Sequence, residues 1–441
     1  MRSRLLYERW LFTSRAFAAD LALIDIGADR SWTFAELLKD AEKPIHRAAD
    51  RDLVAFPRGS NAGFILTLLS AWRHGIPACP LDSVQPPPAL GHLPASCAHV
   101  KITSATSGTP KSVVFTAEQL AADAENILAT MGLRTDWPNL ACISLAHSYG
   151  FSNLVLPLLL HGVPLVLVPA PLPEVIARAA KRVPAITLPA VPALWKTWHE
   201  AGTLPPNLRL AISAGAPLPM PLEQAVFSAT GIKIHNFYGS SECGGIAYDR
   251  SNTPRFDAAC AGSPMENVRL SISAEGTLVV ESSAVGERYW PQAAPNLGNG
   301  RFETSDLAEI RDGDVFLRGR IADVVNVAGR KISPDAIEDA LRAHPAVVEC
   351  VVFGVPDQEG RGEAIVAALH TGSQVGIGEM TTFLSRKLPA WQIPRHWWFT
   401  NRIEMNSRGK ISRAEWKGRF LEMRACGTAR ADARPPNGLV I

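Results

Sequence analysis

Residues 183–230 read VPAITLPAVPALWKTWHEAGTLPPNLRLAISAGAPLPMPLEQAVFSAT and alternate two strand-like runs with two helical patterns. Val183–Pro189 and Leu208–Ser213 are short apolar runs typical of buried strands. Ala193–Ala201 and Pro221–Thr230 carry apolar residues at helical spacing. Strands that alternate with helices of this length are typical of a parallel sheet covered by helices. The stretch therefore predicts an α/β fold.

The same alternation extends toward the N-terminus, with a strand over Ser112–Phe115 and a helix over Ala117–Met131. The most apolar stretch, Leu154–Pro171, approaches the length of a membrane span. Internal prolines and the pair His161-Gly162 interrupt it. It fits a buried helix, a turn at this pair and a buried strand over Leu165–Val168 better than a membrane span.

A different pattern begins after residue 260. Val268–Ile272, Gly276–Glu281 and Leu307–Leu317 are predicted to form antiparallel strands, with tight turns at Glu275-Gly276 and Asp312-Gly313. We expect these strands to form a β-barrel-like subdomain of the large N-terminal domain.

The pattern changes again after Arg320, where a helix over Pro334–His344 and short strands indicate a compact α+β unit. We expect three parts: an N-terminal domain of layered parallel-rich sheets over residues 1–320, a small C-terminal domain over 321–424, and a flexible tail over 425–441. The tail is rich in Ala, Arg, Pro and Gly.

Composition excludes several classes of protein. The chain of 441 residues has 47% apolar and 20% charged residues, which is ordinary for a globular protein. Its net charge of +2 gives no sign of nucleic-acid binding. Its seven cysteines are widely spaced without a C-x-x-C pair, which argues against a disulfide framework or a zinc site. With no signal-peptide pattern at the N-terminus, we expect a cytoplasmic protein with reduced thiols.

The segment Thr103–Lys111, between two strand-like runs, combines hydroxyls, small residues and one lysine. Such a turn suits a phosphate chain, because small residues let backbone N–H groups approach the oxygens while the hydroxyls and the ammonium add donors. It lacks the two glycines of a Walker A loop, since only Gly108 is present. Taken alone, it fits a polar surface loop better.

Three further motifs carry groups suited to a nucleotide. Asn236–Glu242 holds an aromatic face for a purine and a hydroxyl beside a carboxylate for Mg²⁺ and a phosphate oxygen. Asp306 can accept both hydroxyls of a ribose, and Arg320 can pair with a phosphate. Ser407–Arg413 carries Lys410 on a glycine-containing turn. Singly, these motifs are weak: Asn236–Glu242 also fits a strand end with a turn, and Ser407–Arg413 a solvated hairpin tip.

The order and spacing of these motifs resemble the adenylate-forming superfamily, which includes acyl- and aryl-CoA synthetases. The resemblance covers about Ser31 to Phe420. It also includes Ser31–Leu37, Leu69–Pro77, Ser213–Leu218, Gly262–Pro264, Gly319–Arg320 and the segment up to Glu338. Ala105 stands where glycine is usual, and the part between Asp82 and Thr103 is shorter than usual, so the chain resembles a trimmed member.

The resemblance implies a role for each motif. The residues implied to bind ATP are Thr103, Ser104, Thr106, Ser107, Gly108, Lys111, Gly215, Ala216, Pro217, Asn236, Phe237, Tyr238, Gly239, Ser241, Asp306 and Arg320. Glu242 is implied to ligate Mg²⁺. The residues implied to be catalytic are Lys410, Glu242 and His147.

The resemblance implies that the small domain is a mobile lid. It would alternate between a pose that presents Lys410 for adenylation and one that opens a pantetheine tunnel. The hinge position is usually Asp or Lys, and here it is Ala322.

His147 aligns with a histidine near the acid site of acyl- and aryl-acid ligases; a packed core histidine is the alternative. Amino-acid adenylation domains carry an Asp near here, and none lies between Leu145 and Leu160. Because a buried ammonium without a partner is costly, an amino-acid substrate is disfavoured. We expect a fatty or aromatic acid with an uncharged tail.

The resemblance implies an ATP- and Mg²⁺-dependent ligase that converts an acyl or aryl carboxylic acid to an acyl adenylate, releases pyrophosphate and transfers the acyl group to CoA. An alternative acceptor is the phosphopantetheine of an acyl carrier protein in a biosynthetic cluster. An alternative of another class is a catalytically inactive scaffold that binds nucleotide.

Overall fold

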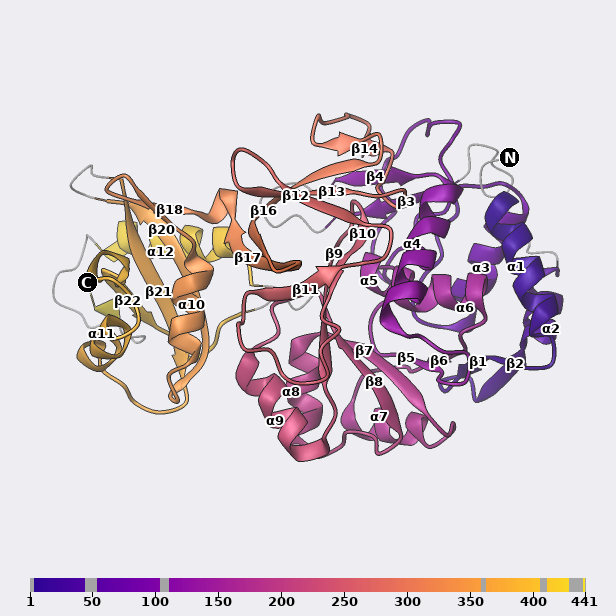
Figure 1. The fold of residues 1–441 in the computed structure, drawn as a ribbon, viewed down its shortest axis with the longest axis horizontal. Coiled ribbons are helices and arrows are strands. Elements are labelled where there is room, and N and C mark those ends of the chain that lie inside the picture. Colours follow the sequence, from indigo (N-terminus) through magenta and orange to yellow (C-terminus); the bar gives the residue numbers. More distant parts are fainter. Residues whose placement is uncertain are drawn as a thin grey trace.

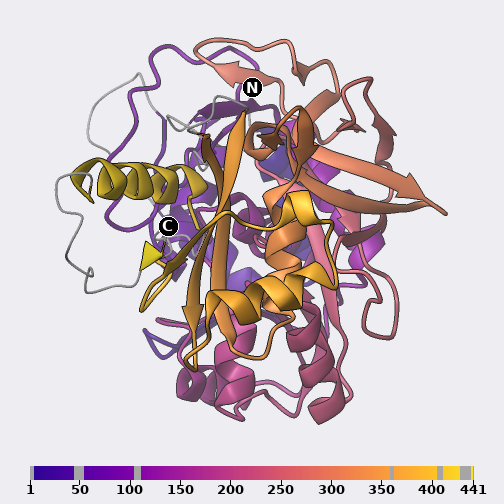
Figure 2. The same cartoon turned by 90° about the vertical axis from the view of Figure 1, so that its left-hand side faces the viewer.

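The computed structural model describes residues 4–43, 54–103, 111–357, 362–404, 411–427 and 439–440. Figure 1 shows a large body that carries every element up to β17 and a smaller unit beside it, which carries the elements from β18 onward. In the view turned by 90°, the smaller unit lies in front of the large body (Figure 2).

A parallel sheet forms the centre of the large body. Its strands are β1 (Leu21–Asp25), β5 (Asn139–Ala141), β6 (Leu165–Leu167), β7 (Ile186–Ala190), β8 (Leu208–Ser213) and β9 (Ile234–Ser240). They lie in the order β9-β8-β7-β5-β6-β1 with parallel pairing throughout, and β2 (Arg30–Thr33) pairs antiparallel to β1 at the edge. The α/β fold predicted from residues 183–230 is confirmed.

Helices cover both faces of this sheet. Leu165 and Leu167 of β6 belong to a core formed with α1 (Arg4–Ala16), α2 (Phe34–Ala41), α3 (Ala62–Arg73), α4 (Ala117–Met131) and α6 (Leu156–His161). Val166, between them, faces a second core formed with α7 (Pro173–Ala180), α8 (Pro192–Glu200) and α9 (Met220–Thr230). Successive side chains of a strand point to opposite faces, so the apolar run of β6 is buried on both sides.

Local signals set the ends of α4. Thr116 and Gln119 form a capping box at its start, each side chain accepting a hydrogen bond from the other's backbone N–H. Gly132, with φ of 69°, ends the helix in the left-handed conformation that glycine adopts readily.

The expectation for Leu154–Pro171 is also confirmed. The π-helical segment η1 (Phe151–Val155) and α6 come first, Gly162 ends the helix with φ of 74°, and β6 follows. No helix of the described residues is long and apolar enough to cross a membrane.

Antiparallel strands extend the central sheet beyond β9. They are β10 (Gly244–Tyr248), β11 (Cys260–Pro264), β12 (Arg269–Ile272), β13 (Thr277–Glu281), β16 (Arg301–Arg311) and β17 (Asp314–Arg320), in the order β12-β13-β16-β17-β11-β10, with β15 (Leu297–Gly298) beside β16. The tight turns are confirmed, with φ of 82° at Gly276, 52° at Asp312 and 86° at Gly313. These strands make up the subdomain expected to be barrel-like.

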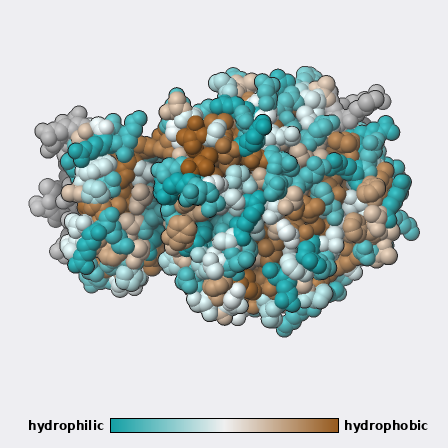
Figure 3. Space-filling view, in the orientation of Figure 1, coloured by the Kyte–Doolittle hydropathy of each residue, from teal (hydrophilic) through white to brown (hydrophobic). Residues whose placement is uncertain are grey.

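A separate three-stranded sheet holds the start of the phosphate motif. It contains β3 (His99–Ile102), β4 (Ser112–Phe115) and β14 (Arg288–Trp290), in the order β14-β4-β3. Figure 3 shows hydrophobic residues gathered over the antiparallel strands beside the smaller unit. Ile272 of β12 and Ile310 of β16 are exposed.

The smaller unit has a four-stranded sheet of β20 (Val347–Pro356), β21 (Glu363–Thr371), β22 (His396–Phe399) and β23 (Leu439–Val440), with β18 (Val325–Val327) and β19 (Arg330–Ile332) as a separate pair. Alternate residues of β20 face two cores. One contains α10 (Pro334–Arg342) and α11 (Ile377–Ser385), and the other contains α12 (Arg413–Gly427). The tail expected to be flexible begins inside α12, and its Leu439–Val440 pair with β22.

Candidate active site

The carboxyl ends of parallel strands place several predicted residues at one edge of the sheet. Ser144 and His147 follow β5, and Gly215 follows β8. Ligands of open α/β sheets bind outside the carboxyl ends of the strands. Gly215 has φ of 84°, which favours glycine in the turn that leaves β8. Ala216 and Pro217 continue this turn toward α9.

Strands from the parallel and the antiparallel parts of the large sheet bring Tyr238, Asp306 and Arg320 together. The Tyr238 hydroxyl donates to Asp306 Oδ2 over 2.5 Å, and Arg320 Nε donates to Asp306 Oδ1 over 3.0 Å. Asp306 on β16 and Arg320 on β17 are register partners, so the hairpin itself sets this ion pair. Burial, and then the Asp306 charge, raise the pKa of Tyr238, so its hydroxyl remains a donor.

A second group surrounds Tyr289 of β14, which the sequence did not single out. The Tyr289 hydroxyl donates to Glu242 Oε1 over 3.1 Å, and Lys111 Nζ lies 4.8 Å from the centroid of its ring. Burial, and then the Glu242 charge, raise the pKa of Tyr289. Thus one phenol connects the lysine of the phosphate motif with the carboxylate expected to bind Mg²⁺.

Backbone contacts fix the segments that carry these groups. Thr103 N–H donates to the Lys111 carbonyl over 2.8 Å, and Lys111 N–H donates to Thr103 Oγ1 over 3.1 Å. The predicted residues between them, Ser104, Thr106, Ser107 and Gly108, lie outside the described residues. Glu242 N–H donates to Ser240 Oγ over 3.1 Å, which holds the turn that also contains Ser241.

The remaining predicted adenine-side residues lie on β9. Asn236 Nδ2 donates to the Cys260 carbonyl over 3.2 Å, and Phe237 is buried. Gly239 faces β10 so closely that a Cβ there would lie 2.6 Å from the Gly244 carbonyl oxygen. Larger residues at this position would therefore separate β9 from β10.

His147 lies in a polar group that sequence reasoning found only in part. His147 Nε2 lies 3.0 Å from Asp82 Oδ2, and Ser144 Oγ donates to Asp82 Oδ1 over 2.6 Å. The side chains of His147 and Asp82 are 33% and 39% exposed, so His147 is not a packed core histidine. Two residues further on, Tyr149 packs against Phe237 with ring centroids 5.7 Å apart. The His147 segment is thus connected to the adenine-side strand.

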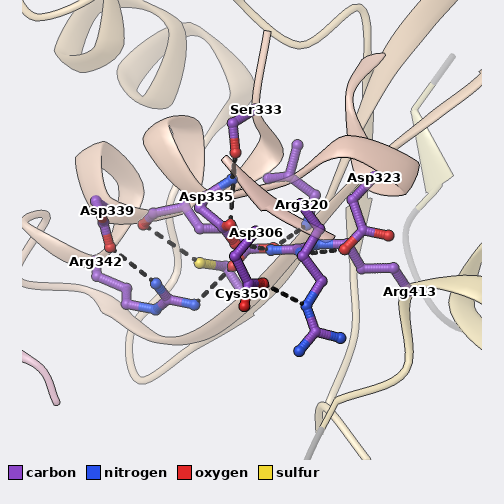
Figure 4. Close-up of polar contacts among 11 residues, drawn as sticks. Asp306, Arg320, Asp323, Ser333, Asp335, Asp339, Arg342, Cys350 and Arg413 are labelled. Carbon is purple, nitrogen blue, oxygen red and sulfur yellow. Dashed lines mark hydrogen bonds and ion pairs between the residues drawn. The ribbon is translucent and has the colours of Figure 1, made fainter. Parts of the chain in front are cut away.

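Lys410 lies outside the described residues, but the start of α12 three residues later is described. Figure 4 shows Arg413 directed toward Asp323 and Asp335. Arg413 Nη1 lies 2.9 Å from Asp323 Oδ2, and its Nη2 pairs with Asp335 and lies 2.9 Å from Glu338 Oε1. Asp323 ends the short helix η2 (Ile321–Asp323), which contains Ala322. Asp306 and Arg320 lie beside this network (Figure 4).

The donor set fits a magnesium ion that arrives with a nucleotide. No group of three or more His, Cys, Asp or Glu residues in the described parts of the chain could hold a metal alone. Mg²⁺ is commonly held by one or two carboxylates together with substrate phosphates and water. The partly buried Glu242 carboxylate, which shares Tyr289 as a neighbour with Lys111, is suited to this arrangement.

Tyr238, Asp306 and Arg320 form one polar group, and Glu242 and Lys111 both contact Tyr289. These groups are suited to a nucleotide-dependent enzyme, and two family models agree. The family described as AMP-binding enzyme matches residues 93–290, and the AMP-binding enzyme C-terminal domain matches residues 336–410.

Relatives of known activity agree with this class. A 2-succinylbenzoate–CoA ligase of Bacillus cytotoxicus is 30% identical over 331 residues, covering 71% of this chain and 68% of the relative. A feruloyl-CoA synthase of an Amycolatopsis species is 28% identical over 371 residues, covering 78% and 74%.

Solved structures show the same fold. ATP-bound MatB from Rhodopseudomonas palustris superimposes with a TM-score of 0.83 at 19% identity, covering 96% of this chain and all of that one. The o-succinylbenzoate CoA synthetase MenE from Bacillus subtilis, in complex with its acyl-adenylate intermediate, gives 0.80 at 21% identity and covers 93% and 97%.

The chain belongs to the AMP-binding enzyme family. It is an AMP-forming acid–thiol ligase, which activates a carboxylic acid with ATP and transfers the acyl group to CoA.

Proposed function

We propose that this ligase activates an acyl or aryl monocarboxylic acid whose tail is uncharged. The observation that carries this proposal is the Asp82 carboxylate, 39% exposed, which contacts His147 at the carboxyl end of β5. A second carboxylate on the substrate would meet a like charge there. Tyr149, two residues from His147 and partly exposed, offers aromatic surface near this pair, which suits an aliphatic or aromatic tail.

The proposed chemistry begins with two anions that must approach each other. The substrate carboxylate oxygen attacks the α-phosphorus of ATP, and the bond to the pyrophosphate oxygen breaks. Lys111 places a positive charge where the phosphate motif ends, and Lys410 is proposed to reach the acid and phosphate oxygens during this step only. Bound Mg²⁺ would supply neutralisation of phosphate charge.

Other residues of the chain hold these groups in place. Tyr289 donates to Glu242 and so orients the carboxylate proposed to ligate Mg²⁺. The Asp306 carboxylate is proposed to accept the ribose hydroxyls, with Tyr238 and Arg320 fixing its orientation. Ser241 is proposed to contact the α-phosphate, and the Gly215–Pro217 turn and Asn236–Gly239 to flank the adenine.

We propose that residues 1–320 and 321–424 are the two domains of the reaction cycle, with Ala322 as the hinge. The cores support this division, because the clusters of residues 325–420 are separate from those of the large body. Reduced thiols support a cytoplasmic location: the six described cysteines whose side chains are placed are all buried and form no disulfide.

An acyl carrier protein remains the alternative acceptor to free CoA. Both present the same phosphopantetheine thiol, so the pantetheine tunnel implied by the resemblance would accept either. The inactive-scaffold alternative predicts nucleotide-dependent thermal stabilisation without pyrophosphate release.

The test is pyrophosphate release with ATP and Mg²⁺ against pooled carboxylic acids, each pool with and without CoA. Acids with uncharged tails form one set of pools, and their analogues that carry a second carboxylate form a matched set. We expect CoA-dependent turnover in the pools of acids with uncharged tails. Preferential turnover of the dicarboxylic analogues would refute the substrate class, and release that stalls at one equivalent regardless of CoA would point to a carrier protein.

A further inference from the structure

Three buried polar side chains meet beneath the site, in a cluster formed by Lys101 of β3, Asp123 of α4 and Ser152 of η1. Ser152 Oγ donates to Asp123 Oδ2 over 2.5 Å, and Lys101 Nζ lies 3.2 Å from Ser152 Oγ and 3.5 Å from Asp123 Oδ2. The side chains of Lys101 and Asp123 are only 3% and 2% exposed. Substrate therefore has no direct access to the ion pair.

The cluster also holds the turn that follows Glu242. Gly245 N–H donates to Asp123 Oδ1 over 3.2 Å. A Cβ on Gly244 would lie 2.0 Å from the same oxygen, so the carboxylate packs directly against this turn. Any shift of Asp123 would therefore reach the backbone two or three residues from Glu242.

Lys101 and Ser152 belong to elements that lead into the site, and Asp123 contacts the turn that follows Glu242. β3 ends one residue before Thr103, where the phosphate motif begins. The segment η1 follows directly after the Ser148–Gly150 turn that His147 precedes. The three segments proposed to bind phosphates, acid and Mg²⁺ thus share one buried anchor.

Stability alone does not account for such a cluster. Removing two charges from water costs free energy, and a well-packed apolar pair of similar volume is often as stable or more stable. A buried polar network with satisfied partners instead favours one arrangement of the elements it connects.

We propose that Asp123, which is buried against Lys101 and Ser152, is a positioning residue that sets Glu242 relative to the phosphate motif, and so determines the enzyme's requirement for Mg²⁺. The inference rests on the proposed role of Glu242. The decisive contact is the hydrogen bond from Gly245 to Asp123, because it joins the cluster to the Glu242 turn and can be removed by substitution.

A matched pair of double variants isolates this contact. Lys101→Met/Asp123→Asn removes both charges but retains an amide oxygen that accepts from Gly245, while Lys101→Met/Asp123→Leu also removes the acceptor. The measured quantity is the Mg²⁺ concentration that gives half-maximal acid-dependent pyrophosphate release. We expect the Leu variant to raise it about tenfold, which is at the low end of the effects seen when groups that orient metal ligands are removed. The Asn variant should stay near the wild-type value.

Two further measurements separate positioning from folding. Transfer from a supplied acyl adenylate to CoA should be equal in the two variants, because it needs no magnesium pyrophosphate. Asp25→Asn is the control for a buried carboxylate far from Glu242, since Asp25 accepts from the N–H groups of Ala28 and Ala62. It should lower the melting temperature without changing the Mg²⁺ midpoint.

Equal Mg²⁺ midpoints in the Leu and Asn variants would overturn the proposal, as would a parallel loss of both half-reactions. If the wild-type chain releases no pyrophosphate with any acid, the proposed function fails instead. The role of the cluster is then tested by thermal unfolding with ATP at increasing Mg²⁺ concentration. The Mg²⁺ concentration that gives half of the ATP-dependent rise in melting temperature should shift in the Leu variant and not in the Asn variant.

Discussion

Replacing Asp82 by Asn should weaken the selection against acids that carry a second carboxylate. The change removes one negative charge and keeps a side chain of similar size beside His147 and Ser144. Because Asp82 is 39% exposed, its field is partly screened by water, and the full low-dielectric energy does not apply.

The size of the effect follows from Coulomb's law. With an effective dielectric constant of about 40, between the values for a protein surface and for water, two unit charges about 7 Å apart repel by about 1.2 kcal/mol. Since 1.36 kcal/mol corresponds to a factor of about ten, this repulsion amounts to about eightfold in kcat/KM.

The assay compares kcat/KM for a neutral carboxamide-bearing acid and for the analogue in which a carboxylate replaces the carboxamide. In Asp82→Asn the ratio between the two should fall about eightfold. Ser144→Ala is the control, because it removes a hydrogen bond to the same carboxylate without changing charge. The reasoning is refuted if the ratio stays constant in Asp82→Asn, or if both variants shift it equally.

Three further predictions concern the proposed reaction cycle. Lys410→Ala should abolish acid-dependent pyrophosphate release while sparing transfer from a supplied acyl adenylate; an equal loss of both would contradict its role. Ala322→Pro should spare adenylation and slow transfer, and if both half-reactions fell together Ala322 would not be the hinge. Tyr238→Phe removes the 2.5 Å hydrogen bond to Asp306 and should raise the KM for ATP about tenfold, as expected for a bond to a charged group; an unchanged KM would show that Asp306 needs no such partner.

The fold was predictable where local signals set it. The predicted bounds of the helix Ala117–Met131 agree with the structure because its capping box and its C-terminal glycine are local in sequence. The turns at Gly276 and Asp312-Gly313 are set by residues that tolerate positive φ. In contrast, α12 was not predicted, and it is held by tertiary packing of Trp416 and Phe420 against β20 rather than by a strong local pattern.

The site was predictable as a set of motifs but not as a geometry. Tyr238 and Asp306 are 68 positions apart, and only the path of strands through the sheet brings them together. Tyr289 and Asp82 were missed because neither lies in a motif with a local chemical pattern. Their partners, Glu242 and His147, are 47 and 65 positions away along the chain. A single sequence contains no signal for pairs of this kind.

The contacts around Ala322 are consistent with the proposed hinge. Alanine stands there at a position where members of the adenylate-forming superfamily usually have Asp or Lys. On one side, Arg320 is paired with Asp306 of the large body over 3.0 Å. On the other side, Asp323 is paired with Arg413 of α12 over 2.9 Å. Arg413 also binds α10, so Asp323 is fixed to the smaller unit. Only Ile321 and Ala322 lie between the two ion pairs. If Ala322 is the hinge proposed above, a change of backbone angles there would rotate the smaller unit without breaking either pair. The hinge residue itself would then need no charged side chain, because its neighbours supply the anchors.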